Sequence, residues 1–145
     1  LPRVLGVHPE TGEKITASDV EKHFGAVGFT RVLALAEKIL TNDLKGSLTY
    51  LHELANDGHN LVDLVKELIH YLRKVLTLKY NPDLEEFFKN ELTSKELIEL
   101  KNHIKIIDEK KHVPLLKSLI TAYSQMRYSQ FQAIPVEIAL IEHLR

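Results

Sequence analysis

The strongest pattern in the sequence is the spacing of apolar side chains between Asn60 and Tyr80. They recur at intervals of three and four, along one side of a 3.6-residue helix, at Leu61, Leu64, Val65, Leu68, Ile69, Leu72, Val75, Leu76 and Leu78. Asn60 is a suitable N-cap, and Asn81-Pro82 ends the run. A stripe this wide must be covered by other helices, so this helix is predicted to form the centre of a bundle.

Shorter amphipathic segments lie on both sides of this central one. They predict helices at residues 16–24, 29–40, 44–56, 83–92, 93–107, 113–128 and 135–145, with a break at Gly25-Ala26-Val27-Gly28. Asp43 is a predicted N-cap, and Thr93 with Glu96 is a predicted capping box. No alternating pattern predicts a strand. The predicted fold class is therefore all-α, a bundle of about six to eight helices.

The same periodicity predicts which side chains of the shorter segments face inward. Before the central helix these are Val20, Phe24, Val32, Leu33, Leu35, Ala36, Ile39, Leu40, Leu44, Leu48, Leu51, Leu54 and Ala55. After it they are Leu84, Phe87, Phe88, Leu97, Ile98, Leu100, Ile104, Ile107, Leu115, Leu116, Leu119, Ile120, Tyr123, Val136, Ile138, Ala139, Ile141 and Leu144. Broad apolar faces on exposed helices would mark a subunit interface.

Composition narrows the possible functions. The 145 residues are enough for one domain, perhaps with a short piece of another, and the absence of cysteine excludes disulfides, a thiol nucleophile and a Cys-containing zinc site. Nineteen basic and twenty acidic residues are too balanced for a typical free-standing nucleic-acid binder. No apolar run is long enough to span a membrane. Leu1 is not a natural start residue, which suggests a fragment of a longer, cytoplasmic protein.

Motifs for chemistry are scarce. There is no phosphate-binding loop of the form G-x-x-x-x-G-K-S/T, no G-x-G-x-x-G and no H-E-x-x-H. Two Glu-x-x-His pairs, Glu67/His70 and Glu109/His112, have the spacing of a di-iron bundle enzyme. Their predicted positions lie off the core direction or in a lysine-rich polar turn. Solvated i,i+3 pairs are therefore the favoured interpretation, and a di-metal enzyme is kept as an alternative.

Three stretches, taken in order, resemble the C-terminal region of the gamma/tau subunit of bacterial DNA polymerase III, the ATPase subunit of the clamp loader. The first, ITASDVEKHFGAV (residues 15–27), is similar to the helix that ends the family's AAA+ lid. The second is residues 31–79, with the long helix and its L-x-x-L-x-x-x-L-x-x-Y-L-R pattern. The third is Arg127-Tyr128-Ser129 followed by IPVEIALIEHL (residues 134–144).

The resemblance implies a division into a connector plus the last lid helix, residues 1–27, and a helical collar (oligomerisation) domain, residues 28–145. It implies that the domain supports ATP-dependent clamp loading in DNA replication as part of a hetero-oligomer with other loader subunits. ATP, Mg²⁺, the sliding clamp and DNA would bind upstream domains. The fragment itself is then expected to hold no cofactor or metal and to have no catalytic residue or ATPase activity, although the full-length protein would be an ATPase.

Other assignments remain open at the level of sequence. The chain could be the collar of a delta or delta-prime subunit or of a related AAA+ protein, the di-metal enzyme described above, or an independent DNA-binding domain. The candidate residues for a partner interface are exposed aromatic and charged side chains of the long helix and the last two helices, namely Tyr71, Arg73, Tyr80 and Tyr128.

Overall fold

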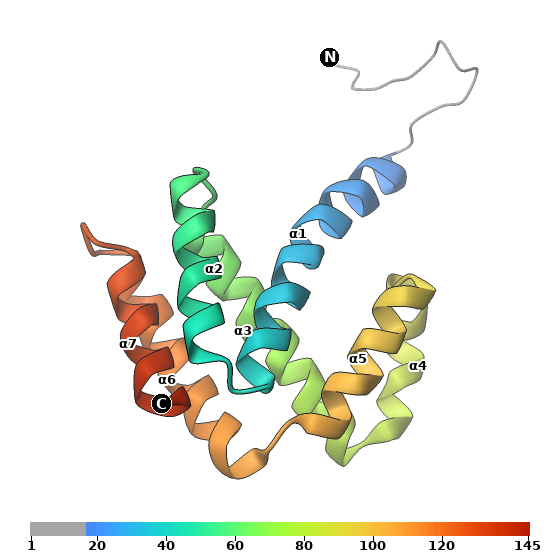
Figure 1. Ribbon diagram of the computed structural model, residues 1–145. Coiled ribbons are helices and arrows are strands. Elements are labelled where there is room, and N and C mark those ends of the chain that lie inside the picture. The colour runs from blue at the N-terminus through green and yellow to red at the C-terminus, as the bar shows by residue number, and fades with distance from the viewer. Residues whose placement is uncertain (1–16) are drawn as a thin grey trace. The chain divides into compact units, whose positions relative to one another are not determined.

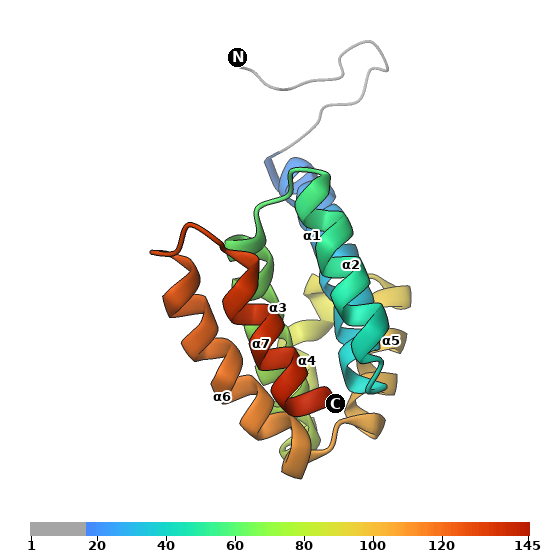
Figure 2. The same cartoon turned by 60° about the vertical axis from the view of Figure 1, so that its left-hand side comes forward.

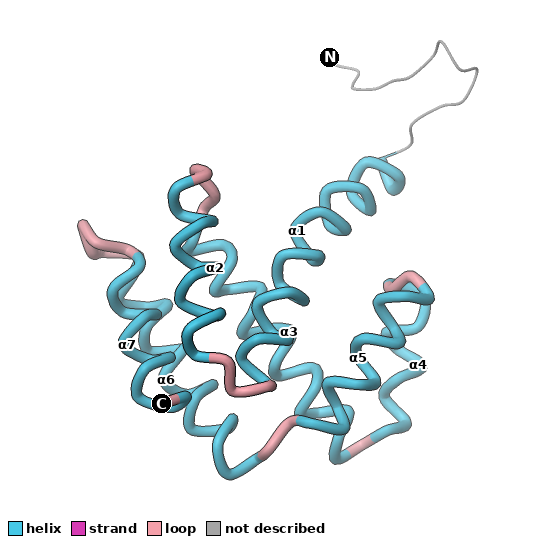
Figure 3. The backbone as a smooth tube through the Cα atoms, in the orientation of Figure 1, coloured by secondary structure: helices cyan, strands magenta, loops and turns pink. Residues whose placement is uncertain are grey.

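The computed structural model describes the backbone of residues 17–145 and the side chains of residues 28–145. Between residues 17 and 145 the chain forms seven α-helices and no strand, which confirms the all-α prediction (Figures 1 and 3). Two short 3-10 helices, Pro82–Leu84 and Lys89–Glu91, flank the smallest α-helix. The α-helices are α1 (Ala17–Leu40), α2 (Leu44–Asn56), α3 (Leu61–Tyr80), α4 (Glu85–Phe88), α5 (Ser94–Ile106), α6 (Glu109–Met126) and α7 (Ala133–Leu144).

The contacts divide the chain into two compact units, residues 1–31 and 32–145, with the boundary inside α1. The backbone of α1 is helical from Ala17 to Leu40, so the predicted break at residues 25–28 is wrong. Each glycine there costs a helix only about 1 kcal/mol, which a helix of 24 residues accommodates. Thr16, where the sequence predicts the first helix to begin, lies outside the described residues. The division into a lid part and a collar part remains a prediction.

Helix α3 is the centre of the second unit, as predicted. It contacts α2, α5 and α6, while α7 packs against α2 and α6 (Figure 2). Its buried side chains are Leu61, Leu64, Val65, Leu68, Tyr71, Leu72, Val75 and Leu78. All six inward-facing residues predicted between positions 32 and 40 are buried as well. The period of 3.6 residues therefore identified the buried side of α3 and of the second half of α1, with Ile69 and Leu76 half-buried at its edge.

The predicted caps are present. The Asp43 carboxylate accepts a hydrogen bond of 2.8 Å from the Gly46 backbone amide, and Asn60 Oδ1 accepts one of 3.1 Å from the Asp63 amide. Thr93 and Glu96 form both hydrogen bonds of a capping box, which confirms the start of α5. These side chains satisfy backbone amides that have no partner within their own helix.

Helix α6 begins at residue 109, four residues before the predicted start at residue 113 and within the predicted polar turn. The Asp108 carboxylate accepts a 3.0 Å hydrogen bond from the Lys110 amide and so provides the N-cap. Pro114 lies within this helix and is exposed. Helix α7 similarly begins two residues before Pro135, which places the proline in its first turn, where the missing amide hydrogen costs least.

Several side chains predicted to face inward are exposed instead. The exposed fractions are Phe87 72%, Ile98 60%, Ile120 51%, Ile138 51% and Ile141 40%. The periodicity gives the direction of an apolar face, but the covering helices decide how wide the buried part is. Helices α5 and α7 lie at opposite edges of the bundle (Figure 1). Neither helix is surrounded by other helices on all sides, so parts of their apolar faces remain exposed.

Candidate functional site

The four candidate interface residues have different environments. Tyr71 is only 2% exposed, so the prediction that it is an exposed aromatic is wrong. Arg73, Tyr80 and Tyr128 are exposed as predicted. A side-chain hydrogen bond to Glu109 raises the pKa of Tyr80, and the Arg127 guanidinium lies 5.9 Å from the centre of the Tyr128 ring. The structure does not bring these four residues together into one site.

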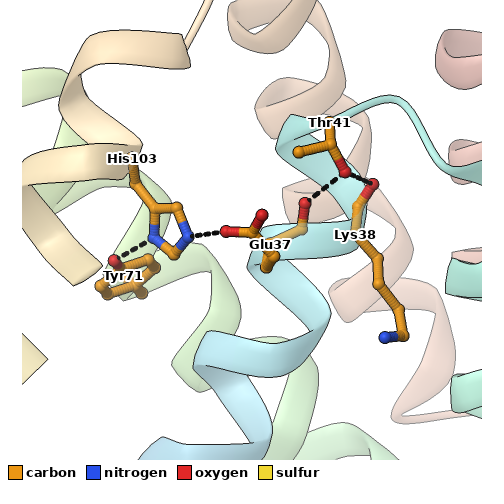
Figure 4. A network of polar contacts seen from close by, with 5 residues as sticks. All are labelled: Glu37, Lys38, Thr41, Tyr71 and His103. Carbon is orange, nitrogen blue, oxygen red and sulfur yellow. Dashed lines mark hydrogen bonds and ion pairs between the residues drawn. The ribbon is translucent and has the colours of Figure 1, made fainter.

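Tyr71 instead belongs to a polar network that connects three helices, in which Tyr71 and His103 are buried and Glu37 is exposed (Figure 4). Its hydroxyl lies 2.5 Å from Nδ1 of His103, and Nε2 of the same ring lies 2.8 Å from Oε1 of Glu37. The carboxylate can only accept, so the imidazole donates its Nε2 hydrogen to Glu37 and accepts from Tyr71 through Nδ1. One side chain thus joins α1, α3 and α5.

The electrostatics of this network keep the tyrosine protonated. Burial raises the pKa of Tyr71, and the negative charges of Glu99 and Glu37 raise it further. The hydroxyl therefore remains a hydrogen-bond donor at physiological pH. A carboxylate–imidazole–hydroxyl chain also resembles a catalytic relay, but here the tyrosine and the imidazole are both almost fully buried. The arrangement is suited to fixing helices to one another.

The two Glu-x-x-His pairs do not converge. Glu67 and His70 are both exposed on α3, in agreement with the solvated interpretation. His112 is not solvated: it is 2% exposed, and its Nδ1 accepts a 2.8 Å hydrogen bond from the Asp108 amide. That correction arises because α6 starts earlier than expected and turns this side chain into the bundle. Among residues 28–145 no group of three or more His, Asp or Glu could hold a metal ion.

The environment of His112 disfavours a charged ring. Burial lowers its pKa; the Asp108 carboxylate opposes this, and the positive charges of Lys111 and Lys79 add to it. Its Nε2 is buried without a hydrogen-bond partner in the described part of the chain. A neutral imidazole with Nδ1 as the acceptor fits these observations.

A groove lies between α6 and α7. Its lining residues are Lys117, Ser118, Thr121, Ala122, Gln125, Pro135, Ile138, Ala139 and Glu142. Ser118 Oγ and His143 Nε2 are 2.7 Å apart and connect the two helices beside it. A serine–histidine pair alone does not make a nucleophile site, since that chemistry also needs an orienting group on the histidine and donors for an oxyanion.

The most extensive unassigned feature is exposed apolar surface. Ten large apolar side chains between residues 28 and 145 are exposed: Tyr80, Phe87, Ile98, Ile106, Ile120, Tyr128, Phe131, Ile134, Ile138 and Ile141. Sequence reasoning assigned four of the isoleucines, Ile98, Ile120, Ile138 and Ile141, to the core and so missed them. One signal in the sequence could have indicated their exposure. The apolar face of the last helix is wider than one neighbouring layer of helices can cover.

A family model described as domain III of DNA polymerase III subunits gamma and tau matches residues 15–145. The chain belongs to this family. The resemblance found in the sequence is thereby confirmed, and gamma/tau domain III is a domain of a DNA polymerase III subunit. No curated protein and no solved structure matches the chain significantly.

Membership of the gamma/tau domain III family agrees with the geometry. The buried polar side chains Ser47, His103 and His112 all make hydrogen bonds inside the domain, whereas apolar side chains remain exposed at its surface. No helix in the described part of the chain is long and apolar enough to cross a membrane.

Proposed function

We propose that this domain is the oligomerising collar of a gamma/tau-type subunit of the DNA polymerase III clamp loader. It holds the subunits of the loader together and so supports the ATP-dependent loading of the sliding clamp during DNA replication. The observation that carries this proposal is the exposed apolar surface of a gamma/tau domain III chain. Ten large apolar side chains exposed on the surface of a small domain favour a protein–protein interface.

The remaining parts of the proposal follow from this role. Residues 1–27 end the AAA+ lid and residues 28–145 form the collar. The partners are other loader subunits in a cytoplasmic hetero-oligomer, and ATP, Mg²⁺, the sliding clamp and DNA bind to upstream domains of the full-length ATPase. The hydrogen bond between the buried ring of His103 and the exposed Glu37 carboxylate supports a scaffold role, because it holds α5 against α1.

Association measurements test this proposal. The purified chain is analysed by size-exclusion chromatography with light scattering, alone and mixed with each of the other loader subunits from the same organism. We expect stable association, and we expect no ATP hydrolysis by the chain alone. A chain that remains monomeric at about 100 μM and co-elutes with no loader subunit would disprove the collar function.

A further inference from the structure

The segment between α3 and α5 lacks the buried apolar face that holds the longer helices in place. It comprises residues 82–91, which form α4 and the two 3-10 helices beside it and lead from the end of α3 to the start of α5 (Figure 1). We call this segment the strap. None of its side chains is fully buried: Leu84 and Phe88 are half-buried, and Phe87 is 72% exposed. Because apolar burial is the main force that fixes a helix to a core, other contacts must contribute to holding the strap.

Lys74 of α3 makes two contacts with the strap. Its Nζ lies 4.5 Å from the centre of the Phe88 ring and 3.9 Å from Oε1 of Glu91. The first is a cation–π contact and the second is an ion pair, and a single ammonium group makes both. Since Phe88 and Glu91 lie in the second half of the strap, Lys74 fastens that half to α3.

Two further lysines form ion pairs with the strap. Lys101 Nζ of α5 lies 3.6 Å from Oε2 of Glu85, and these side chains are 52% and 27% exposed. Water and salt screen a pair as exposed as this one, so it holds the strap weakly. The pair of Lys89 with Glu86, at 3.5 Å, lies within the strap and cannot fasten it to the bundle. Lys74 is therefore the main charged contact between the strap and the bundle.

The surroundings of Lys74 place two opposing contributions in balance. With the strap closed, the Lys74 side chain is 19% exposed, so its ammonium group has lost much of its contact with water. Opening the strap breaks both contacts of Lys74 but restores the hydration of the charge, and these two changes in free energy partly cancel. A segment held by so small a difference can leave the bundle while the rest of the domain stays folded.

From these contacts we propose that residues 82–91 are a strap that opens and closes on the folded domain, with Lys74 as its latch. When the strap is closed, Phe88 lies against the Lys74 ammonium group. When it is open, Leu84 and Phe88 join Phe87 as exposed apolar side chains. The core needs no rearrangement, since the buried side chains of α3 and α5 come from outside the strap. The strap thus sets how much apolar surface the connection between α3 and α5 presents, and this inference does not depend on the proposed collar function.

Hydrogen exchange of the whole chain tests the latch through Lys74→Gln, which keeps a polar side chain of similar length but removes the charge. A helix of four residues such as α4 does not persist once it leaves the bundle, so its amides report the opening of the strap. We expect strap peptides of the variant to exchange about 3- to 30-fold faster than those of the unmodified chain. Urea well below the unfolding midpoint should leave strap exchange unchanged while it speeds exchange in the middle of α3, because opening the strap exposes little surface.

Two control variants separate the latch from general effects on stability. Lys89→Gln removes the same charge from a lysine whose ion pair lies within the strap. Tyr71→Phe removes a core hydrogen bond to His103 that remains intact when the strap opens. Strap exchange in both controls should stay within about twofold of that in the unmodified chain, although Tyr71→Phe should speed exchange in α3. Circular dichroism shows whether each variant is folded.

A double-mutant cycle tests whether the contact of Lys74 with Phe88 forms the latch. Phe88→Leu should also speed strap exchange, and its combination with Lys74→Gln should have less than the summed effect, because both changes remove the same contact. Additive changes, or strap exchange unaltered by Lys74→Gln, would overturn the latch. Strap exchange that rises with urea as steeply as that of α3 would overturn the strap itself, because the segment would then open only with the whole domain. Association with other loader subunits is measured separately, so none of these outcomes bears on the collar function.

Discussion

His103 connects three helices, because its two ring nitrogens contact Tyr71 and Glu37. Replacing Tyr71 by Phe removes the donor and leaves Nδ1 buried without a partner. We expect the free energy of unfolding to fall by about 1–3 kcal/mol, measured by urea denaturation. Tyr80→Phe is the control: that side chain is 61% exposed, so its loss should be within about 0.5 kcal/mol. Equal losses would contradict a special role for the buried hydroxyl.

His112 predicts a pH dependence of stability. Its pKa is lowered in the folded chain, chiefly by burial, so the unfolded chain binds a proton more readily. The contribution of His112 to the free energy of unfolding is fully present above about pH 6.5, the ordinary histidine pKa. It is lost as the pH falls through the lowered pKa of the folded chain.

The variant for this test is His112→Asn, whose side-chain oxygen can still accept from the Asp108 amide but does not titrate. We expect the free energy of unfolding to fall more for the unmodified chain than for the variant between pH 7.5 and pH 5.5. The reason is that only the unmodified chain has a ring here that binds a proton more readily when the chain is unfolded. Urea denaturation of both proteins at both pH values gives the four free energies of unfolding that are compared. The other seven histidines are present in both proteins, so their contributions cancel in the comparison. Parallel pH profiles would contradict the assignment.

At the scale of single helices, the start of α2 shows how a cap can oppose helix propensity. A Cβ placed on Gly46 would lie 2.1 Å from Oδ2 of Asp43, the carboxylate that caps the helix. Gly46→Ala should therefore give little of the usual stabilisation of about 1 kcal/mol, because the cap, worth a similar amount, is displaced. In an Asp43→Ala background the gain should reappear. Unfolding free energies of the four proteins form a double-mutant cycle, and an additive cycle would contradict this coupling.

Local signals explain which elements were predictable. The caps at Asp43, Asn60 and Thr93 act within three residues of themselves, so the sequence shows both partners. The direction of each apolar face also follows from neighbouring residues. The width of the buried part does not, because it depends on which helices cover it. That is why Ile98 and Ile138 were assigned to the core and are exposed.

The polar network of Tyr71, His103 and Glu37 could not be predicted from the sequence, for a related reason. His103 lies 66 residues from Glu37 and 32 from Tyr71, and nothing near any of them indicates the pairing. Tyr71 was therefore read as an exposed aromatic, although it lies on the covered side of α3. The three stretches that resemble the gamma/tau family did identify the domain. The order and spacing of such stretches can be read from the sequence, whereas single contacts between distant residues cannot.

At the scale of the whole molecule, the arrangement of helices predicts an order of local stability. Helix α3 is covered by α2, α5 and α6, and eight of its side chains are buried. The segment of residues 82–91, made of α4 and its two 3-10 neighbours, buries none of its side chains fully. Amides of α3 can therefore open only with the core, whereas those of the segment can open locally.

Hydrogen exchange followed by mass spectrometry measures this order directly. We expect peptides from the middle of α3 to exchange at least about 100-fold more slowly than peptides from residues 82–91. Labelling in strong denaturant corrects for intrinsic rates. Similar rates in α3 and in residues 82–91 would contradict the central position of α3. Slow exchange in α3 together with fast exchange in residues 82–91 would show that the core of the domain is organised around α3 and that the short helices open without it.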